Sequence, residues 1–492
     1  MELIWKEIEA ERLISNETVQ VHIEGELPSP DGRTPIEIPI ATARVIVEGA
    51  SADAGEIRIS GRIAVQVTAT DESNTPFAFE SSAGFTHRIE CGKALPGMRA
   101  MVSPSVQSIA VTPAASGASI SAAVDLNVRL VSAVPLKVTG GIAGVKDLEI
   151  KTKTVNCTSK QLIGSDTLRL REELSAEGIG SIVNTEGQIN VRDVSIEQGA
   201  AAVSGTITVS AVTVDGAGRF GQLIRQIPFR EKIALNLLAD RPYCTASIDS
   251  IYLRALGEEF ALVSMEAQVT FSVFGLTEKE LTLPVDAFSP SIGFDCLYDE
   301  AMLLSCEGNA TEQLSLKETI PLPDNASEMA APLFVTARPL VTSVDVDGES
   351  ISIEGVLATT AAFESASGRC YTFTEDVPFS ASIDNPTGAD MPLVTASCSA
   401  QITGTAERAL QIQYSLLLNS EILRTERIEV VTGLAERELP ERKSGIVISF
   451  ASSGEDVFDA AKRYGVSCES VRKLNPDIKE PFLEGDKLII LV

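Results

Sequence analysis

Residues suited to catalysis at neutral pH are scarce in this sequence. Histidine occurs only at His22 and His87, and each lies in a stretch where apolar and polar residues alternate, which is typical of a β-strand. A Ser/His/Asp hydrolase would need one of these histidines, and the sequence has no G-x-S-x-G turn to present a serine nucleophile. We therefore expect two packed or solvated imidazoles and no catalytic residues.

Carboxylates and thiols give equally little support to a metal site or a cofactor. Asp345-Val346-Asp347-Gly348 begins like a calcium loop, but the downstream ligands are missing, so we predict a hairpin turn there. A glycan hydrolase would need a defined pair of carboxylates, and 68 acidic residues nominate no pair. The sequence also lacks a G-x-x-x-x-G-K-[ST] phosphate loop, so any ATP hydrolysis would belong to a partner.

The cysteines form no C-x-x-C pair and do not recur at one position of the repeat described below. We interpret them as reduced thiols in preference to disulfides or metal ligands. They are Cys91, Cys157, Cys244, Cys296, Cys306, Cys370, Cys398 and Cys468. We expect a protein that is not an enzyme and that holds neither a metal nor a cofactor.

The element that organises the chain is a strand that occurs three times. Ile57 to Val67 alternates apolar and polar residues around a glycine, Gly61. A copy follows at 203–209 and a looser one at 353–359, and the glycines are 144 and 150 residues apart. A phenylalanine follows each copy at a similar distance, at Phe85, Phe229 and Phe379. Because the flanking residues recur with the glycine, we read the chain as tandem modules.

The predicted modules span residues 1–145, 146–291 and 292–433. Each has a lead-in strand, a hairpin containing the repeated glycine, a strand with the phenylalanine, a second hairpin and a closing strand, which predicts an antiparallel β-sandwich or barrel. The charged start, Glu2 to Arg12, is expected to be a short helix or a frayed end, and 49–55 a turn. Asp347-Gly348 favours a type I′ turn. Residues 434–445 read as a charged linker.

Charge and hydropathy narrow the class of partner. The formal net charge is −28, with a pI near 4.5, which argues against nucleic acid or an anionic membrane as partner. No apolar run approaches the roughly 20 residues of a membrane-spanning helix. Residues 1–7 lack a basic region followed by an apolar one, so no secretory signal is expected. We expect a cytoplasmic protein without a transmembrane segment.

The last unit, residues 446–492, has a different pattern. Ile446 to Phe450 reads as a strand, and Ser453 to Asp456 signals a helix start. Gly465 ends that helix, Ser467 starts a second one, and Lys487 to Val492 supplies another strand. The predicted order is therefore βααβ.

These residues resemble a LysM domain. The resemblance is carried by short segments in order, at 454–456, 461–466, 474–476 and 484–488. It implies a groove for N-acetylglucosamine polymers such as peptidoglycan, between the loop after the first strand and the loop after the second helix. The implied groove residues are Ser453, Gly454, Glu455, Asp456, Val457, Leu474, Asn475, Pro476, Asp477 and Ile478. Glu455-Asp456 replaces the usual Gly-Asp-Thr pattern, and this acidic entrance favours a protein ligand over a glycan.

Three β-rich modules followed by such a unit resemble the SPOCS-LysM proteins of spore-forming Firmicutes. Residues 284–290 are similar to the segment that closes SPOCS modules. The resemblance implies a non-enzymatic scaffold of the spore coat in the mother cell, at the forespore surface, with a protein partner such as a SpoIVA-like coat ATPase. The alternative is a wall-associated protein whose LysM unit binds peptidoglycan.

Overall fold

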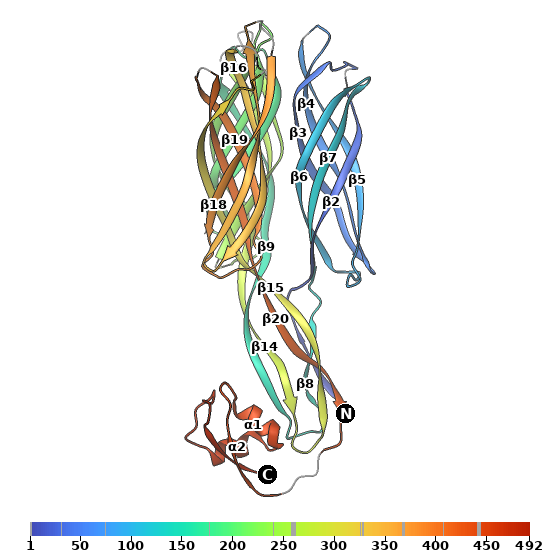
Figure 1. The fold of residues 1–492 in the computed structure, drawn as a ribbon, viewed down its shortest axis with the longest axis vertical. Helices are drawn as coiled ribbons and strands as arrows, with labels where there is room; N and C mark the ends of the chain where they lie inside the picture. Colours follow the sequence, from blue (N-terminus) through green and yellow to red (C-terminus); the bar gives the residue numbers. More distant parts are fainter. Residues whose placement is uncertain are drawn as a thin grey trace.

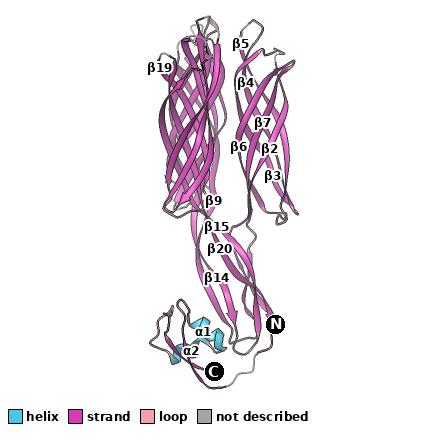
Figure 2. Cartoon of the chain, viewed as in Figure 1, coloured by secondary structure: helices cyan, strands magenta, loops and turns pink. Residues whose placement is uncertain are grey.

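The computed structural model describes residues 2–30, 32–73, 75–176, 178–239, 241–256, 262–324, 326, 329–366, 370–406, 408–439 and 444–492. Strands dominate it, and the two helices of the described residues both lie in the last unit (Figure 2). The prediction of a mainly β protein built from antiparallel sheets is confirmed. Residues 440–443 of the predicted linker lie outside the described residues.

Module one contains eight strands. They are β1 (Leu3–Ile8), β2 (Arg12–Pro28), β3 (Glu37–Asp53), β4 (Glu56–Thr70), β5 (Pro76–Glu90), β6 (Arg99–Ala114), β7 (Gly117–Ser132) and β8 (Leu136–Ile142). One sheet has the order β3-β4-β5, β2-β7-β6 forms half of a six-stranded sheet that continues into module three, and β1 pairs with β8 alone. All these pairings are antiparallel.

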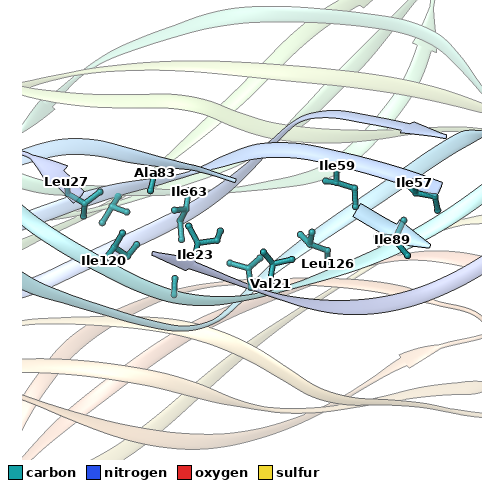
Figure 3. Packing of buried hydrophobic residues seen from close by; sticks show 14 of the residues in the cluster. Val21, Ile23, Leu27, Ile57, Ile59, Ile63, Ala83, Ile89, Ile120 and Leu126 are labelled. Atoms are coloured by element: carbon teal, nitrogen blue, oxygen red, sulfur yellow. The ribbon is translucent and has the colours of Figure 1, made fainter. Parts of the chain in front are cut away.

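Alternation in the sequence builds the core between the two sheets of module one. Ile57, Ile59 and Ile63 of β4 are almost fully buried against residues of β2 and β7, such as Ile23 and Leu126 (Figure 3). The intervening residues of β4 point outward, as the period-two pattern requires. A core of flat aliphatic side chains leaves little room for a ligand inside the module.

Modules two and three repeat these pairings with fewer, longer strands. The strands are β9 (Glu149–Ser175), β10 (Ser181–Glu197), β11 (Ala200–Val214), β12 (Phe220–Ala234), β13 (Arg241–Leu256) and β14 (Leu262–Phe288), then β15 (Phe294–Pro321), β16 (Met329–Asp347), β17 (Ser350–Ser365), β18 (Cys370–Asp384), β19 (Leu393–Ala406) and β20 (Ala409–Glu436). Three sheets have the orders β10-β11-β12, β13-β14-β9 and β16-β17-β18, and a six-stranded sheet has the order β19-β20-β15-β2-β7-β6, in which Leu303 of β15 pairs with Arg12 of β2. In these modules one long strand, β9 or β15, takes the place of β1 and β2 together. Likewise, β14 and β20 each take the place of β7 and β8 together.

The strands extend below the modules as three ribbons that form a narrow stem (Figure 1). The ribbons are β1 with β8 and the lower parts of β9 with β14 and of β15 with β20. Each ribbon contributes matched apolar residues to one core, for example Val138, Leu283 and Val430, all fully buried. Because no single ribbon could bury these side chains, the stem requires all three modules.

Above the stem the modules contact one another in a closed ring. Arg44 of β3 donates to the carbonyl of Ile248 in module two at 3.0 Å. Gln188 of β10 donates to the carbonyl of Ser397 in module three at 2.9 Å. Arg338 of β16 completes the ring by donating to carbonyls in β6 of module one, including that of Gln107 at 3.2 Å. The three donors stand at equivalent positions of the repeat. The third contact joins module three to module one, so each module contacts both of the others.

One residue from each module meets at an ionic node between the ring and the stem. Glu421 of β20 accepts a hydrogen bond from Lys160 of β9 at 2.7 Å and lies 4.0 Å from Arg129 of β7. The Arg129 side chain is 4% exposed, and burial lowers the pKa of its guanidinium while the Glu421 charge opposes that shift. Lys160 also lies 4.1 Å from the ring centre of Phe274. This node ties the three modules together through charge.

The repeated glycine and phenylalanine lie directly opposite each other in every module. Gly61 pairs with Phe85, Gly205 with Phe229, and Gly355 with Phe379 across adjacent strands. A Cβ on any of these glycines would meet the ring of its phenylalanine partner at under 3.0 Å. The ring therefore fills the space that a side chain would take, which explains why the two residues recur together.

Three local expectations are wrong. The start of the chain is neither helical nor frayed, because β1 pairs with β8, a partner that no local pattern reveals. The turn expected at 49–55 is shorter, since β3 continues to Asp53. Asp347 pairs with Ser350, so the turn residues are Gly348 and Glu349; of these two only Gly348 has a positive φ, whereas a type I′ turn requires both.

The last unit contains β21 (Ile446–Phe450), α1 (Val457–Tyr464), α2 (Cys468–Leu474) and β22 (Lys487–Leu491), with β21 and β22 antiparallel. We call residues 444–492 the terminal unit. It sits beside the foot of the stem (Figure 1). The predicted end of module three at residue 433 falls within β20, which continues to Glu436. None of the described helices is long and apolar enough to cross a membrane.

Candidate functional site

The first loop of the predicted groove, Ser453–Val457, is fixed by the start of α1. Asp456 caps the helix by accepting from the backbone N–H of Asp459 at 3.0 Å, and Asp459 accepts in return from the Asp456 N–H at 3.2 Å. Gly465 ends the helix with φ 64°, a left-handed conformation that suits glycine. Because Asp456 and Gly465 cap the two ends of α1, the position of this helix could be predicted from the sequence.

The second loop, Leu474–Ile478, is held by the side chain of Asn475. Its amide donates to the carbonyls of Val471 at 2.8 Å and Ile489 at 2.7 Å, and its oxygen accepts from the Ile489 N–H at 2.7 Å. Asn475 therefore ties the end of α2 to β22. Its side-chain amide and oxygen are both engaged within the unit, which gives Asn475 a structural role.

A shallow hollow of about 170 Å³ lies between the two loops. Of the predicted groove residues it brings together Val457, Asn475, Pro476 and Ile478. The remaining predicted residues do not line it: Ser453, Gly454, Glu455, Asp456, Leu474 and Asp477. Sequence reasoning missed the other lining residues: Val471, Arg472, Glu480, Phe482 and Leu488. Val471 and Leu488 belong to the apolar pattern of their elements, which predicts burial. That pattern does not distinguish a residue that lines a hollow from any other core residue.

The charged groups around the hollow are already paired. Glu455 forms an ion pair with Arg463, and the backbone N–H of Ser452 together with that arginine holds the Glu455 pKa below its usual range. Arg472 contacts Glu480 at 3.3 Å on the rim. The polar groups that a sugar would use are thus mostly occupied, while the floor of the hollow is apolar.

The stem itself occupies part of the predicted groove. Lys151 of β9 lies 2.9 Å from carboxylate oxygens of both Asp456 and Asp459. Burial alone would raise the Asp456 pKa, but the hydrogen bonds from Lys151 and from the Asp459 backbone outweigh it and lower that pKa. The Asp456 carboxylate therefore faces the stem and is not free for a ligand.

Further contacts dock the terminal unit on the ribbon formed by β9 and β14. The rings of Phe288 and Phe458 meet edge to face with centres 5.0 Å apart. Lys462 contacts Asp286 at 2.6 Å, and Glu149 accepts from the Cys468 backbone N–H at 3.0 Å. Both helices thus face the stem, and Phe288 belongs to the core of the terminal unit.

Reversing the charge of Lys151 is expected to loosen this docking. A Lys151→Glu variant loses the charged hydrogen bonds to Asp456 and Asp459, each worth about 1.5–3 kcal/mol. The new carboxylate would also be repelled by both aspartates. We expect faster amide hydrogen exchange in α1 and a larger radius of gyration in small-angle X-ray scattering. Lys317→Glu, an exposed position on β15, makes the same change in net charge and serves as the control. Exchange in α1 that is unchanged from the native chain would show that the ion pairs do not hold the unit.

The rest of the described surface offers no better site for chemistry. A second hollow between modules two and three holds only about 10 Å³ and is lined mainly by glutamine, asparagine and threonine. His22 is exposed on β2, and His87 is partly buried on β5. Within the described ranges no group of three or more His, Cys, Asp or Glu side chains is placed to hold a metal ion. All eight cysteines are free thiols.

The terminal unit thus combines a shallow hollow, whose lining residues Arg472 and Glu480 are paired with each other, with large apolar side chains exposed elsewhere on its surface. The assignments of this unit to the LysM family, and of the chain to the SPOCS-LysM proteins, stay predictions. A scan of known protein families, a search of curated proteins and a search of solved structures each found no match to this chain.

Proposed function

We propose that this protein is a non-enzymatic scaffold of spore-coat assembly that recruits a coat morphogenetic protein through its terminal unit. The partner class follows from the SPOCS-LysM resemblance, which implies a SpoIVA-like coat ATPase at the forespore surface in the mother cell. The single observation that carries the proposal is the state of the predicted groove. The side chains of Glu455, Asp456 and Asn475 are engaged within the chain, whereas large apolar side chains of the same unit are exposed.

Protein recognition suits that surface better than glycan recognition. A sugar is held by hydrogen bonds from placed polar groups, but Asn475 is bonded to Ile489 and Asp456 to Lys151. Exposed apolar patches bordered by polar residues are typical of protein contacts. The terminal unit exposes Ile446, Phe450 and Leu483 by more than half.

The body supports a scaffold role because it is long and its three modules are held together along its length. Ribbons from all three modules share the core of the stem, and the ring of contacts through Arg44, Gln188 and Arg338 fixes each module against its neighbours. Such a body keeps the terminal unit at one end, away from the ring of modules (Figure 1). A structure of this kind separates a binding end from the rest of an assembly.

The proposal is tested by removing the terminal unit in a sporulating bacterium. A fluorescent fusion of the full chain is expected to gather at the forespore surface, and a fusion lacking 444–492 is expected to stay diffuse. Because the deletion uncovers Phe288, the truncated chain also carries Phe288→Ser, and gel filtration with circular dichroism checks its fold. Normal localisation of a folded truncated chain would overturn the proposal.

The wall-binding alternative is tested separately by sedimentation with insoluble peptidoglycan. Under our proposal the full chain and the truncated chain remain in the supernatant to the same extent. If the full chain sediments with peptidoglycan and the truncated chain does not, the terminal unit binds glycan and the scaffold proposal loses its basis. The two assays together decide between protein and glycan as the ligand.

A further inference from the structure

The sheet of the terminal unit turns an apolar face to solvent. Ile446 and Ile448 alternate along β21 and lie opposite Leu491 and Ile489 of β22, and Phe450 lies opposite Lys487. The exposed fractions of these apolar residues are 73% for Ile446, 55% for Ile448, 65% for Phe450, 41% for Ile489 and 53% for Leu491. The other face of the same strands, with Val447, Leu488 and Ile490, packs in the unit's core. A half-buried sheet ordinarily places polar residues on its outer face, so this face departs from the expected pattern.

The outer edge of β21 is open. Gly445 and Val492 exchange two backbone hydrogen bonds, of 3.0 and 2.9 Å. Because bonded pairs alternate along an antiparallel ladder, Val447 and Ser449 bond inward to β22, whereas the N–H and C=O groups of Ile446, Ile448 and Phe450 point outward. Among the described residues no hydrogen-bond partner occupies that edge.

The opposite edge of the sheet is closed by a side chain. The N–H and C=O of Ile489 point away from β21, and both bond to the amide of Asn475, at 2.7 Å each. Asn475 thus copies the hydrogen bonding of a neighbouring strand and blocks further pairing at this point. A small sheet with one edge blocked and one open has a single direction in which it can grow.

We propose that β21 receives an extended strand of a partner protein, with apolar side chains at alternate positions and basic residues at its ends. Main-chain hydrogen bonds at the open edge would hold the strand, and its apolar side chains would cover Ile446, Ile448 and Phe450. The chain carries a net charge of −28, which favours a basic segment over an acidic one.

The same observations disfavour a second copy of this chain as the occupant. Two copies would bring together two molecules that each carry −28. The inference rests on the proposed function, since it names the surface of the terminal unit that a protein partner would use.

A labelled peptide tests the edge directly. The probe is a fluorescein-labelled nine-residue peptide of alternating valine and threonine with a lysine at each end, titrated with the full-length protein and followed by fluorescence anisotropy. We expect saturable binding, several-fold weaker binding when glutamates replace the lysines, and none when a central residue is proline. Absence of saturable binding by the lysine peptide would overturn the proposal.

Matched variants separate the edge from the face. Ile448→Pro removes an outward N–H without touching a bond to β22 and is expected to weaken binding at least about tenfold. Ile489→Thr removes an apolar side chain beside the blocked edge and should change binding less than about threefold. Leu483→Ser removes an exposed apolar side chain outside the sheet and should change nothing. Equal losses in Ile448→Pro and Ile489→Thr would indicate docking on the flat face and contradict strand addition.

Two further measurements keep the outcomes distinct. Thermal unfolding and circular dichroism must show that Ile448→Pro is folded; if it is not, the native chain with the proline-containing peptide tests the same hydrogen bonding, and binding of that peptide equal to that of the lysine peptide would contradict strand addition. Sedimentation velocity that detects a dimer dissolved by the edge variant would favour a second copy and overturn the proposal. If Ile448→Pro still localises as the native chain does while the deletion of 444–492 does not, the proposed function stands and the inference fails.

Discussion

A Glu421→Gln variant is expected to unfold about 3 °C lower than the native protein, with a loss of about 3 kcal/mol in the free energy of unfolding. The substitution keeps the shape of the side chain but removes the negative charge that faces Lys160 and Arg129. Both cations are largely buried, with side chains 21% and 4% exposed, so neither recovers its full hydration. Differential scanning calorimetry measures the shift.

The control for Glu421 is an ion pair on the surface. Glu266 lies 3.3 Å from Arg171, but its side chain is 41% exposed, so Glu266→Gln is expected to cost less than about 1 kcal/mol. Adding Lys160→Met to Glu421→Gln removes one of the uncompensated cations and should restore part of the lost stability. Equal unfolding temperatures for Glu421→Gln and Glu266→Gln would show that the node contributes no more than a surface pair.

Gly205→Ala is expected to destabilise the protein by about 2 kcal/mol or more, although the change adds a single methyl group. The new Cβ would lie 2.7 Å from the nearest ring atom of Phe229 and would also clash with the carbonyl oxygen of Asn190. Asn190 lies on β10, which is paired with β11 along this stretch, so its carbonyl oxygen cannot move without disturbing that ladder. Calorimetry should record a lower unfolding temperature and an earlier onset of unfolding.

Gly84 provides the matched control for Gly205. It also lies within a strand, β5, but a Cβ there would meet only the carbonyl oxygen of Gly61, at an ordinary 3.9 Å. Gly84→Ala is therefore expected to be neutral or slightly stabilising, because alanine loses less conformational entropy on folding than glycine. Similar destabilisation by both substitutions would contradict the steric explanation of the repeated glycine.

The parts of the fold that could be predicted are those encoded within one strand or one hairpin. Alternation around Gly61 identifies β4, and the recurrence of Phe85 at an equivalent spacing identifies the strand beside it. The start of the chain could not be predicted, because β1 is defined by its pairing with β8 more than a hundred residues away. The ring of contacts was equally hidden, because the donor is glutamine in module two and arginine in the other two modules, and each acceptor is a backbone carbonyl that no residue type marks.

The terminal unit shows the same division between local and distant information. Asp456, Gly465 and Ser467 mark the helix ends, and the structure has the helices there. The sequence could not show that Asp456 faces Lys151, because that partner lies in another module. Nor could it show that Asn475 is bonded to Ile489, because an asparagine before a proline suits a turn as well as a ligand contact.

The position of the terminal unit determines how many copies of it the molecule presents. The body repeats its ribbon three times, but only the ribbon of β9 and β14 carries this unit, through Phe288 and Lys151. A homotrimer of the same shape would present three terminal units, whereas this single chain presents one. If the terminal unit binds a protein as we propose, saturation is expected at one equivalent of partner per chain.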